Sequence, residues 1–316
     1  MEGVLPKPDG WFEARMKGLG GSDIAAVLGL SKWSSPMDVW AAKRGLSEEI
    51  PETNAMRRGR LLESAIATWY QEETGYEVVD GEEMPIVGPK PFMLASPDRY
   101  VSAGKSRFGL EIKTARSVDG WGEDLGSGVP VYYATQAAWY MACTNIDRWD
   151  FAVLFLVNDE FRRYTLVRNK KTEKKLVNKC GDWWQKHVVG GEPPPIDGSP
   201  AADKFLQDKF GDPGQEYRTA DPVEEELIFD LHDLQTEIKS MKEREALLKN
   251  QIKERIADNA GLNGVFGTVS WKMNKGRSSL DSKSLRKEHP EIAKQFTKTS
   301  EPSRIFRMNI QHKRGN

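Results

Sequence analysis

Residues 108–113 are the part of the sequence that most restricts how this chain can fold. Apolar and other side chains alternate along the segment, in the order Phe108, Gly109, Leu110, Glu111, Ile112 and Lys113. A β-strand projects successive side chains to opposite faces, so Glu111 and Lys113 share one face and the apolar residues enter the core. The pattern therefore predicts a half-buried strand that carries an acid and a base side by side.

Further strand and helix patterns surround this segment. Strands are predicted at 76–79, 92–95, 108–114, 151–157 and 161–167. Helices are predicted from Ser35-Pro36 to Gly45, at 61–74 before Gly75, and at 131–143 after Pro130, because caps, first-turn prolines and closing glycines bound them. The order of these elements predicts an α/β or α+β fold with a mixed central sheet flanked by helices.

The chain divides into three zones by composition. Residues 1–192 hold the alternating patterns, and 193–222 are rich in Pro, Gly and Asp, which is typical of a linker with a short helical insert. Residues 223–257 predict one long helix whose apolar positions follow a spacing close to 4-3, broken at Glu245. Such a helix packs on its own domain, in a helical hairpin, or as a coiled coil between subunits. A strand at 265–273 and a charged tail complete the extension 223–316.

Charge and cysteine content limit the classes of function. The formal net charge is −1, whereas a protein that coats DNA unselectively is strongly basic, so any DNA contact must come from a local patch. Two cysteines are too few for a disulfide framework or a four-cysteine metal site. No signal-peptide pattern and no apolar run of roughly 18 residues is present. We therefore expect a cytoplasmic protein with no membrane partner.

Asp98 lies at the end of the strand pattern that precedes the loop to Glu111. Two carboxylates and one ammonium group at one place predict a metal-dependent phosphodiesterase site. Mg²⁺ prefers oxygen ligands, so Asp98 and Glu111 are predicted to bind it, with the backbone carbonyl of Ile112 as a third ligand and with Mn²⁺ as a substitute. The ion would polarise a phosphoryl oxygen and help to generate hydroxide, while Lys113 would orient or deprotonate the attacking water.

A Glu-x-Lys pattern is weak evidence by itself. It occurs three times, at 111–113, 173–175 and 237–239. The second and third copies lie on highly charged, helix-like stretches, where a solvated surface is the simpler explanation. Only the copy at 111–113 lies on an alternating strand after a Pro-Asp turn, which makes it the candidate for catalysis.

Several further motifs occur in a defined order between about residues 11 and 157. They are Gly20-Gly21-Ser22-Asp23-Ile24, Ser35-Pro36, Arg58-Gly59, Glu63, Thr74-Gly75, Ser96-Pro97-Asp98, Leu110-Glu111-Ile112-Lys113 and Pro130 with Gln136. Together they resemble the YqaJ-type viral recombinase family. That family is grouped with the lambda-type phage exonucleases, within the PD-(D/E)xK nucleases. The resemblance implies a restriction-endonuclease-like fold for this chain.

The resemblance also implies catalytic roles. Asp98 and Glu111 match the metal ligands of the family, and Lys113 matches its catalytic lysine. Glu63 matches a helix-borne acid near the metal, and Gln136 matches an active-site glutamine. An inward-facing acid needs a partner, which a metal-bound water or Lys113 would provide for Glu63. The simpler explanation of Glu63 is a glutamate on a helix surface. The simpler explanation of Gln136 is a polar residue on a packing helix.

A second group of residues resembles the phosphate contacts of the family. Arg15 and Ser22 lie seven residues apart, as do the residues that hold the terminal 5′-phosphate in lambda-type enzymes. Ser96 resembles another phosphate contact. Backbone N–H groups at the helix start after Gly20-Gly21 would also suit a phosphate, and Arg15 would add a forked contact. The simpler interpretation of Ser22 or Asp23 is an ordinary N-cap.

By resemblance, the chain degrades one strand of linear double-stranded DNA from the 5′ end and leaves 3′ single strands for phage-type homologous recombination. The expected partners are double-stranded DNA ends, a single-strand annealing protein and further copies of the chain. The expected setting is a phage or prophage in a bacterial host. A homo-oligomer is expected, but residues 193–316 leave the trimeric ring of lambda-type enzymes an open question.

Two alternatives stay open. One is an endonuclease or RecB-like nuclease of another polarity that uses the same metal site. The other is a non-catalytic DNA-binding or scaffold protein in which the long helix is the functional part. The ten tryptophans are expected to anchor the core and interfaces, although an exposed one such as Trp33 could stack on a DNA base.

Overall fold

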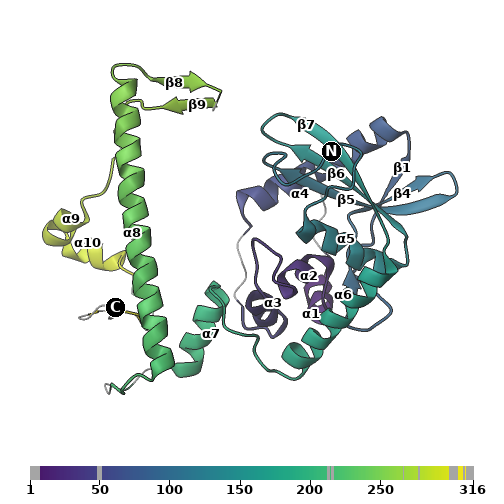
Figure 1. Ribbon diagram of the computed structural model, residues 1–316, viewed down its shortest axis with the longest axis horizontal. Helices are drawn as coiled ribbons and strands as arrows, with labels where there is room; N and C mark the ends of the chain where they lie inside the picture. The colour runs from purple at the N-terminus through teal and green to yellow at the C-terminus, as the bar shows by residue number, and fades with distance from the viewer. Residues whose placement is uncertain are drawn as a thin grey trace. The chain divides into compact units, whose positions relative to one another are not determined.

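The structure is a computed structural model of the chain. It describes residues 8–47, 52–211, 214, 217–265, 267–276, 278–298, 305–308 and 310. The chain divides into two compact units, Met1–Lys209 and Phe210–Asn316. The elements of both units are labelled in Figure 1.

A five-stranded mixed sheet forms the centre of the first unit (Figure 1). Its strands lie in the order β1 (Glu77–Asp80), β4 (Arg99–Ala103), β5 (Ser106–Ala115), β6 (Arg148–Phe155) and β7 (Glu160–Val167). The pair β5–β6 is parallel, and the other neighbouring pairs are antiparallel. A parallel pair needs a crossover connection, and this one contains helix α5 (Val131–Thr144). The predicted fold class, a mixed sheet flanked by helices, is confirmed.

Each face of the sheet is covered by a different helix. Helix α4 (Asn54–Thr74) packs against the apolar side of β5, where Phe108, Leu110 and Ile112 join Ile66, Ala67 and Tyr70 in one cluster. Helix α5 lies over the opposite side, where the aromatic residues of β6 meet it. Since Leu110 and Ile112 face α4, the alternation of β5 turns Glu111 and Lys113 toward α5. The predicted division of this strand into two faces is confirmed.

Local signals bound two helices at the predicted residues, at the start of α3 and at the end of α4. Ser35 Oγ accepts a hydrogen bond from the Asp38 backbone N–H at 3.1 Å and caps α3 (Pro36–Lys43). Gly75, with φ of 68°, ends α4 in the left-handed region that favours glycine. Helix α4 starts at Asn54, well before the predicted residue 61, because Thr53 caps it. The predicted strand 92–95 is reduced to β3 (Leu94–Ala95), which pairs with β2 (Ile86–Val87).

Short helices complete the first unit. They are α1 (Trp11–Met16), α2 (Gly21–Val27), α6 (Lys170–Trp183), its π-helical continuation η1 (Trp184–Val189) and α7 (Pro200–Phe210). Helix α2 packs against α5. Helix α7 falls within 193–222, the predicted linker. Its Ala202 is buried with Met37 and Trp40, and the rings of Phe205 and Trp40 lie 5.3 Å apart. Part of that stretch therefore packs on α3 of the first unit.

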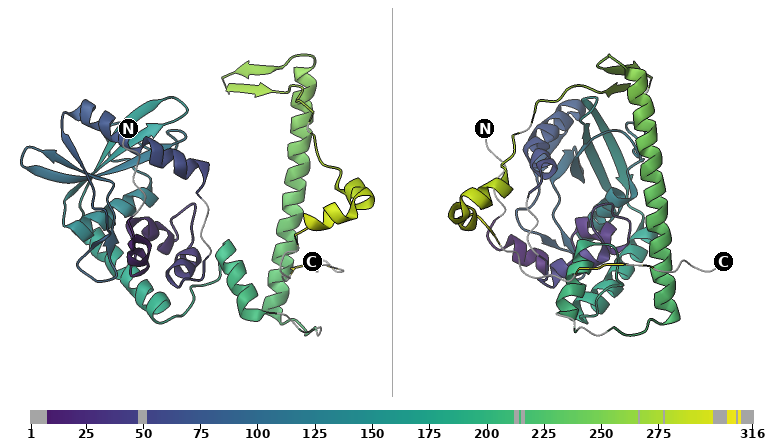
Figure 2. Two further views of the ribbon diagram at one scale, coloured as in Figure 1. Left: turned by 180° about the vertical axis from the view of Figure 1, so that it is seen from behind. Right: turned by 90° about the vertical axis from the view of Figure 1, so that its left-hand side faces the viewer.

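The second unit is built around a long helix, α8 (Pro222–Ile256), as the sequence predicts for 223–257. Figure 2 shows it as one continuous helix with a hairpin at its C-terminal end. Asp221 caps it and Pro222 takes the first helical position. Ile256 is the buried residue of α8, whereas Leu234, Met241 and Leu248 are more than half exposed.

The remaining elements of the second unit are short. The predicted strand 265–273 is wrong in extent: β8 (Gly261–Gly264) and β9 (Gly267–Ser270) form a hairpin instead. Gly267, with φ of 95°, allows the turn between them. Helices α9 (Ser282–Glu288) and α10 (Pro290–Gln295) follow. Among the described residues of either unit, no helix combines the length and the apolarity that a membrane crossing requires.

Candidate active site

Asp98 and Glu111 come together through the pairing of β4 with β5. The register opposes Arg99 to Leu110, so the residue before Arg99 lies opposite the residue after Leu110. Asp98 Oδ2 accepts a hydrogen bond from the backbone N–H of Ile112 at 2.9 Å. The structure thus brings the two predicted acids to the same end of the β4–β5 pair. The contact at Ile112 involves its N–H, and its carbonyl as a metal ligand stays a prediction.

Glu111 is buried, with 1 % of its surface exposed. Its Oε1 accepts hydrogen bonds from Lys113 Nζ and from Gln136 Nε2, each at 2.5 Å. Its Oε2 is buried and has no hydrogen-bond partner among the described residues. Burial, with the nearby charge of Asp98, raises the pKa of Glu111 to about 8 despite the opposing effect of Lys113. A buried carboxylate oxygen without a donor is costly, so this oxygen is a candidate to contact a cation.

Lys113 is a cation at this site. Burial alone would lower the pKa of its ammonium group, but the carboxylates of Glu111 and Asp98 outweigh burial and raise it. The ammonium nitrogen also lies 5.3 Å from the centre of the Tyr133 ring. A lysine held in this way can donate hydrogen bonds and offset negative charge.

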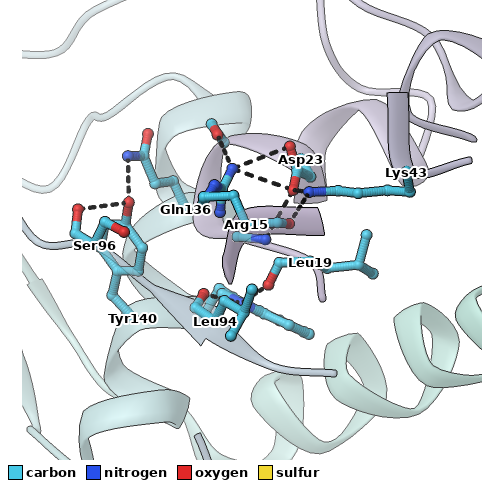
Figure 3. A network of polar contacts seen from close by, with 11 residues as sticks. Arg15, Leu19, Asp23, Lys43, Leu94, Ser96, Gln136 and Tyr140 are labelled. Atoms are coloured by element: carbon cyan, nitrogen blue, oxygen red, sulfur yellow. Dashed lines mark hydrogen bonds and ion pairs between the residues drawn. The ribbon is translucent and has the colours of Figure 1, made fainter. Parts of the chain in front are cut away.

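Gln136 contacts Glu111 and also Tyr140, and Figure 3 shows Gln136, Tyr140 and Ser96 joined by hydrogen bonds. Gln136 Nε2 lies 3.3 Å from the Tyr140 hydroxyl, which donates to the backbone oxygen of Ser96 at 3.1 Å. Ser96 Oγ is buried without a hydrogen-bond partner among the described residues. Gly21 of α2 packs here, since an added Cβ would lie 2.5 Å from the Tyr140 ring. The predicted residues Gln136 and Ser96 are therefore both connected to the site of Glu111.

Arg15 and Ser22 contact each other, as their resemblance to a phosphate-holding pair would require. Figure 3 shows Arg15 and Lys43 on either side of Asp23. Arg15 Nη2 lies 3.2 Å from Ser22 Oγ and 3.3 Å from Asp23 Oδ2. Lys43 Nζ lies 2.9 Å from the same Asp23 oxygen. Burial would raise the pKa of Asp23, but Arg15 and Lys43 outweigh it and lower the pKa. Two cations around one carboxylate leave this cluster with a positive charge.

The start of α2 differs from the interpretation of Ser22 or Asp23 as its N-cap. Gly20 is the N-cap residue, so neither Ser22 nor Asp23 takes that position. Asp23 Oδ2 instead accepts the Gly20 backbone N–H at 2.8 Å. The carboxylate thus occupies one of the N–H groups that were expected to bind phosphate. An added Cβ at Gly20 would lie 1.2 Å from Arg15 Nη1, so glycine makes room for the guanidinium group.

Glu63 has a different partner from the one expected. Arg99 Nη1 donates to Glu63 Oε1 at 2.8 Å and to the backbone oxygen of Asp98 at 2.7 Å. Arg99 thus connects the acid on α4 to the backbone at Asp98, a partner that was not predicted from the sequence. The charge of Glu63 still contributes to the raised pKa of Glu111, after burial and Asp98.

Sequence reasoning missed Arg99 and Lys43 as parts of the site. Arg99 directly follows Asp98, so strand alternation would have turned it to the α4 face, where Glu63 lies; that signal was available. Lys43 has no local signal, because it meets Asp23 only when α3 packs beside α2. Within the described residues, no group of three His, Cys, Asp or Glu side chains has metal-binding spacing. Any metal here must therefore take further ligands from backbone, water or substrate.

Residues 10–147 match the model of the YqaJ-like viral recombinase domain, and all candidate site residues lie within this range. A protein described as uncharacterized protein YqaJ, from Bacillus subtilis (strain 168), is 25% identical over 297 residues, or 92% of this chain and 91% of that protein.

Two solved structures are similar to the chain. The alkaline exonuclease LHK-Exo from Laribacter hongkongensis has a TM-score of 0.48 and 22% identity, over 58% of this chain and 94% of that one. A phage related exonuclease from Haemophilus somnus 129PT has a TM-score of 0.38 and 8% identity, over 55% of this chain and 96% of that one. The resemblance seen in the sequence is confirmed by the domain match.

Proposed function

Since residues 10–147 carry a YqaJ-like viral recombinase domain, we propose that the chain is a metal-dependent exonuclease of linear double-stranded DNA. One observation carries the proposal: Glu111 is buried beside Asp98 and Lys113, and its Oε2 has no donor among the described residues. Most buried carboxylate oxygens in proteins have a hydrogen-bond partner, and at Glu111 the unpartnered oxygen coincides with a second acid and a cation. An acid pair with one open oxygen and an adjacent cation suits phosphodiester hydrolysis.

Asp98 and Glu111 are the proposed metal-binding side chains, with the carbonyl of Ile112 beside them. The donor set fits Mg²⁺, which accepts carboxylate and carbonyl oxygens and retains several waters. Bound Mg²⁺, or Mn²⁺ in its place, would supply a Lewis acid that polarises the phosphoryl oxygen and lowers the pKa of water. The open oxygen of Glu111 supports this assignment, because a cation there would relieve both the missing contact and the repulsion from Asp98.

Lys113 and Gln136 have different proposed roles: Lys113 acts on the water and the phosphate, and Gln136 positions Glu111. The raised pKa of Lys113 keeps it protonated, so it orients water and offsets charge on the phosphate rather than accepting a proton. Gln136 donates to Glu111 Oε1 and so fixes the direction of the other carboxylate oxygen. Glu63 influences the site through Arg99. The roles of Lys113 and Gln136 as catalytic and positioning groups are part of the proposal.

The proposed direction is 5′ to 3′, leaving 3′ single strands for recombination. Arg15 and Ser22 touch, and Arg15 and Lys43 give their cluster a positive charge around Asp23. A terminal 5′-phosphate is the proposed ligand of this cluster. Ser96 Oγ, buried and without a described partner, is a proposed further donor to phosphate. From the family we also propose two partners, a single-strand annealing protein and further copies of this chain. Both would act in a phage-type recombination system.

End-labelled linear duplex, incubated with Mg²⁺ or with EDTA, tests the activity and its direction. The proposal expects immediate release of a 5′ label and progressive shortening of a 3′-labelled strand, with no cleavage in EDTA or of covalently closed circles. Early loss of the 3′ label would indicate the opposite polarity. Cleavage of the circles would indicate an endonuclease. DNA that stays intact with both Mg²⁺ and Mn²⁺ would favour the alternative of a non-catalytic DNA-binding or scaffold protein.

A variant of Arg15 tests the phosphate cluster. Arg15→Ala is expected to slow digestion of 5′-phosphorylated ends by roughly ten- to a hundred-fold, to the rate of 5′-hydroxyl ends, because a charge-assisted contact is lost. Arg168→Ala is the matched control, since Arg168 is similarly buried and pairs with Glu173. An Arg15→Ala enzyme that keeps the full preference for 5′-phosphate would contradict the assignment.

A further inference from the structure

An exposed tryptophan lies near the candidate catalytic lysine. Trp33, in the loop between α2 and α3, has 68 % of its surface exposed. Its ring lies 4.9 Å from that of Tyr132 and 5.9 Å from that of Tyr133, the second and third residues of α5. We call Trp33, Tyr132 and Tyr133 the aromatic platform. The two tyrosines of the platform belong to α5, the same helix that carries Gln136.

The loop holds Trp33 in a defined position. Ser31 Oγ accepts the backbone N–H of Trp33 at 3.2 Å and that of Ser34 at 3.3 Å. The two tyrosine rings also contact each other, with 4.6 Å between their centres, and both contact the indole. An indole fixed in this way loses little side-chain freedom when a ligand stacks on it, which favours binding.

Two cations flank the platform. Lys113 Nζ lies 5.3 Å from the centre of the Tyr133 ring, and Lys32 Nζ lies 5.2 Å from the centre of the Tyr132 ring. The indole is therefore one ring away from the ammonium group proposed to face the reacting phosphate. Proteins that hold single nucleic-acid strands combine these same parts, in which cations follow the backbone and aromatic rings stack on bases.

A packing role alone does not account for this arrangement. Trp69 of α4 gives a comparison within the same unit: its ring is stacked on Phe161 at 4.9 Å with an interplanar angle of 11°, and it is 36 % exposed. One face of the Trp69 ring is thus covered by Phe161 of the same unit. Trp33 meets Tyr132 nearly edge-on, at 84°, and meets Tyr133 at 33° over a longer distance of 5.9 Å. Its exposed fraction, 68 %, is almost twice that of Trp69.

We propose that Trp33, supported by Tyr132 and Tyr133, is a stacking site for the base of a terminal nucleotide, next to the phosphodiester that reaches Lys113. This inference rests on the proposed nuclease function and adds a base-binding site to it. A terminal base exposes one face to stacking while it is paired, and it exposes more of its surface once the strand end opens. Every base has a stacking face, and the site therefore imposes little sequence preference.

Binding of DNA ends in EDTA tests the stacking without cleavage. Trp33→Ala is expected to bind 5′-phosphorylated duplex ends roughly 5- to 100-fold more weakly, and Trp33→Phe within about 3-fold of the wild type. Trp69→Ala is the matched control and is expected to bind normally. Fluorescence anisotropy gives the affinities, and thermal melting shows whether each variant is folded.

A second substrate separates stacking from indirect effects. It carries abasic sugars at the last nucleotides of the 5′-ended strand, with all phosphates kept. The wild type should lose the same affinity on abasic ends that Trp33→Ala loses on normal ends, and Trp33→Ala should lose nothing more. This wild-type comparison holds even if Trp33→Ala fails to fold. Equal wild-type affinity for normal and abasic ends would overturn the inference.

The outcomes also separate this inference from the nuclease proposal. If the wild type cuts DNA with Mg²⁺ and Trp33→Ala keeps full affinity, the stacking site is wrong and the nuclease stands. If the wild type binds normal ends better than abasic ends but never cuts, the nuclease is wrong and the base site stands. If the wild type neither binds nor cuts DNA, both are wrong.

Discussion

Two buried carboxylates lie on neighbouring strands of the same sheet, and they differ in how many hydrogen-bond donors surround them. Glu111 of β5 is 1 % exposed and Asp150 of β6 is 3 % exposed. Asp150 accepts four hydrogen bonds, from the Tyr70 hydroxyl at 2.6 Å, from Arg148 Nε and Nη2 at 2.8 and 2.7 Å, and from Thr165 Oγ1 at 2.8 Å. Both of its oxygens are therefore satisfied. Glu111 has donors on one oxygen and none described on the other.

The difference shows what each acid does. Placing a carboxylate in the interior costs free energy unless donors replace its water. At Asp150 the fold supplies all of the donors, so the group serves to join α4, β6 and β7. At Glu111 the fold supplies donors to one carboxylate oxygen only. The charge of nearby Asp98 also makes ionisation of Glu111 harder. We infer that a cation contacts the second carboxylate oxygen of Glu111.

The largest expected effect is on activity at Glu111 and Lys113. Glu111→Gln keeps the size of the side chain and removes its charge, and Lys113→Ala removes the cation. Each is expected to slow cleavage of linear duplex by roughly a thousand-fold or more, because charge at the reacting phosphate is no longer balanced. Digestion rates in Mg²⁺ measure the loss, and melting temperatures within a few degrees of the wild type would show that the fold is kept.

Normal cleavage by either variant would remove the basis for treating the two carboxylates differently. An inactive but strongly destabilised Glu111→Gln would do the same, because Glu111 would then be structural like Asp150.

The second prediction concerns stability at Asp150. Asp150→Ala leaves Arg148, Tyr70 and Thr165 without their acceptor and is expected to lower the free energy of unfolding by about 2–4 kcal/mol. The partial exposure of Arg148, at 41 % of its side chain, keeps the loss below that of a fully buried pair. Urea unfolding measures it. Cleavage per folded molecule should stay near that of the wild type, and a loss of activity without a loss of stability would reverse the assignment.

Local periodicity explains why much of this arrangement was predictable. The alternation in 108–113 separates Glu111 and Lys113 from the apolar residues with no knowledge of the tertiary fold. Cap residues such as Ser35 and closing glycines such as Gly75 likewise act within a few residues of their position. These features depend on backbone geometry, and a sequence displays that geometry directly.

The partners of the polar groups were less predictable, because they come from distant segments. Arg99 takes Glu63, Lys43 reaches Asp23, and Tyr70 reaches Asp150 across 80 residues of sequence. Asp150 itself lies just before the predicted strand 151–157, and nothing local marks it as buried. Helix α7 was placed in a linker because its flanks are rich in Pro and Gly, yet its apolar side finds Trp40. Tertiary packing decides such cases.

The third prediction uses metal binding and pH. Burial and Asp98 raise the pKa of Glu111 to about 8, above its ordinary value of about 4.3. Between these values the folded metal-free protein holds a proton that the unfolded chain releases, so its stability falls as pH rises. Glu111→Gln should lack this dependence. A cation needs the ionised acid, so Mg²⁺ should stabilise the wild type more at pH 8.5 than at pH 6.5.

Melting curves with and without Mg²⁺ measure this effect. At about 100 times its dissociation constant, Mg²⁺ should add about 2.7 kcal/mol, which is a rise of several degrees. Glu111→Gln and Asp98→Asn should show little of this rise. An equal shift in the wild type and in Glu111→Gln would mean that the ion binds elsewhere.

The smallest expected effect comes from single donors to each acid. Gln136→Leu removes one hydrogen bond to Glu111, and Thr165→Val removes one to Asp150. Each loss is worth about 1–1.5 kcal/mol, but it should appear in different measurements. On the proposal that Glu111 binds a metal, Gln136→Leu should lower the cleavage rate about tenfold and weaken Mg²⁺ stabilisation, whereas Thr165→Val should lower only the free energy of unfolding. If both variants changed stability alone, Gln136 would be a packing residue and the open oxygen of Glu111 would not depend on it.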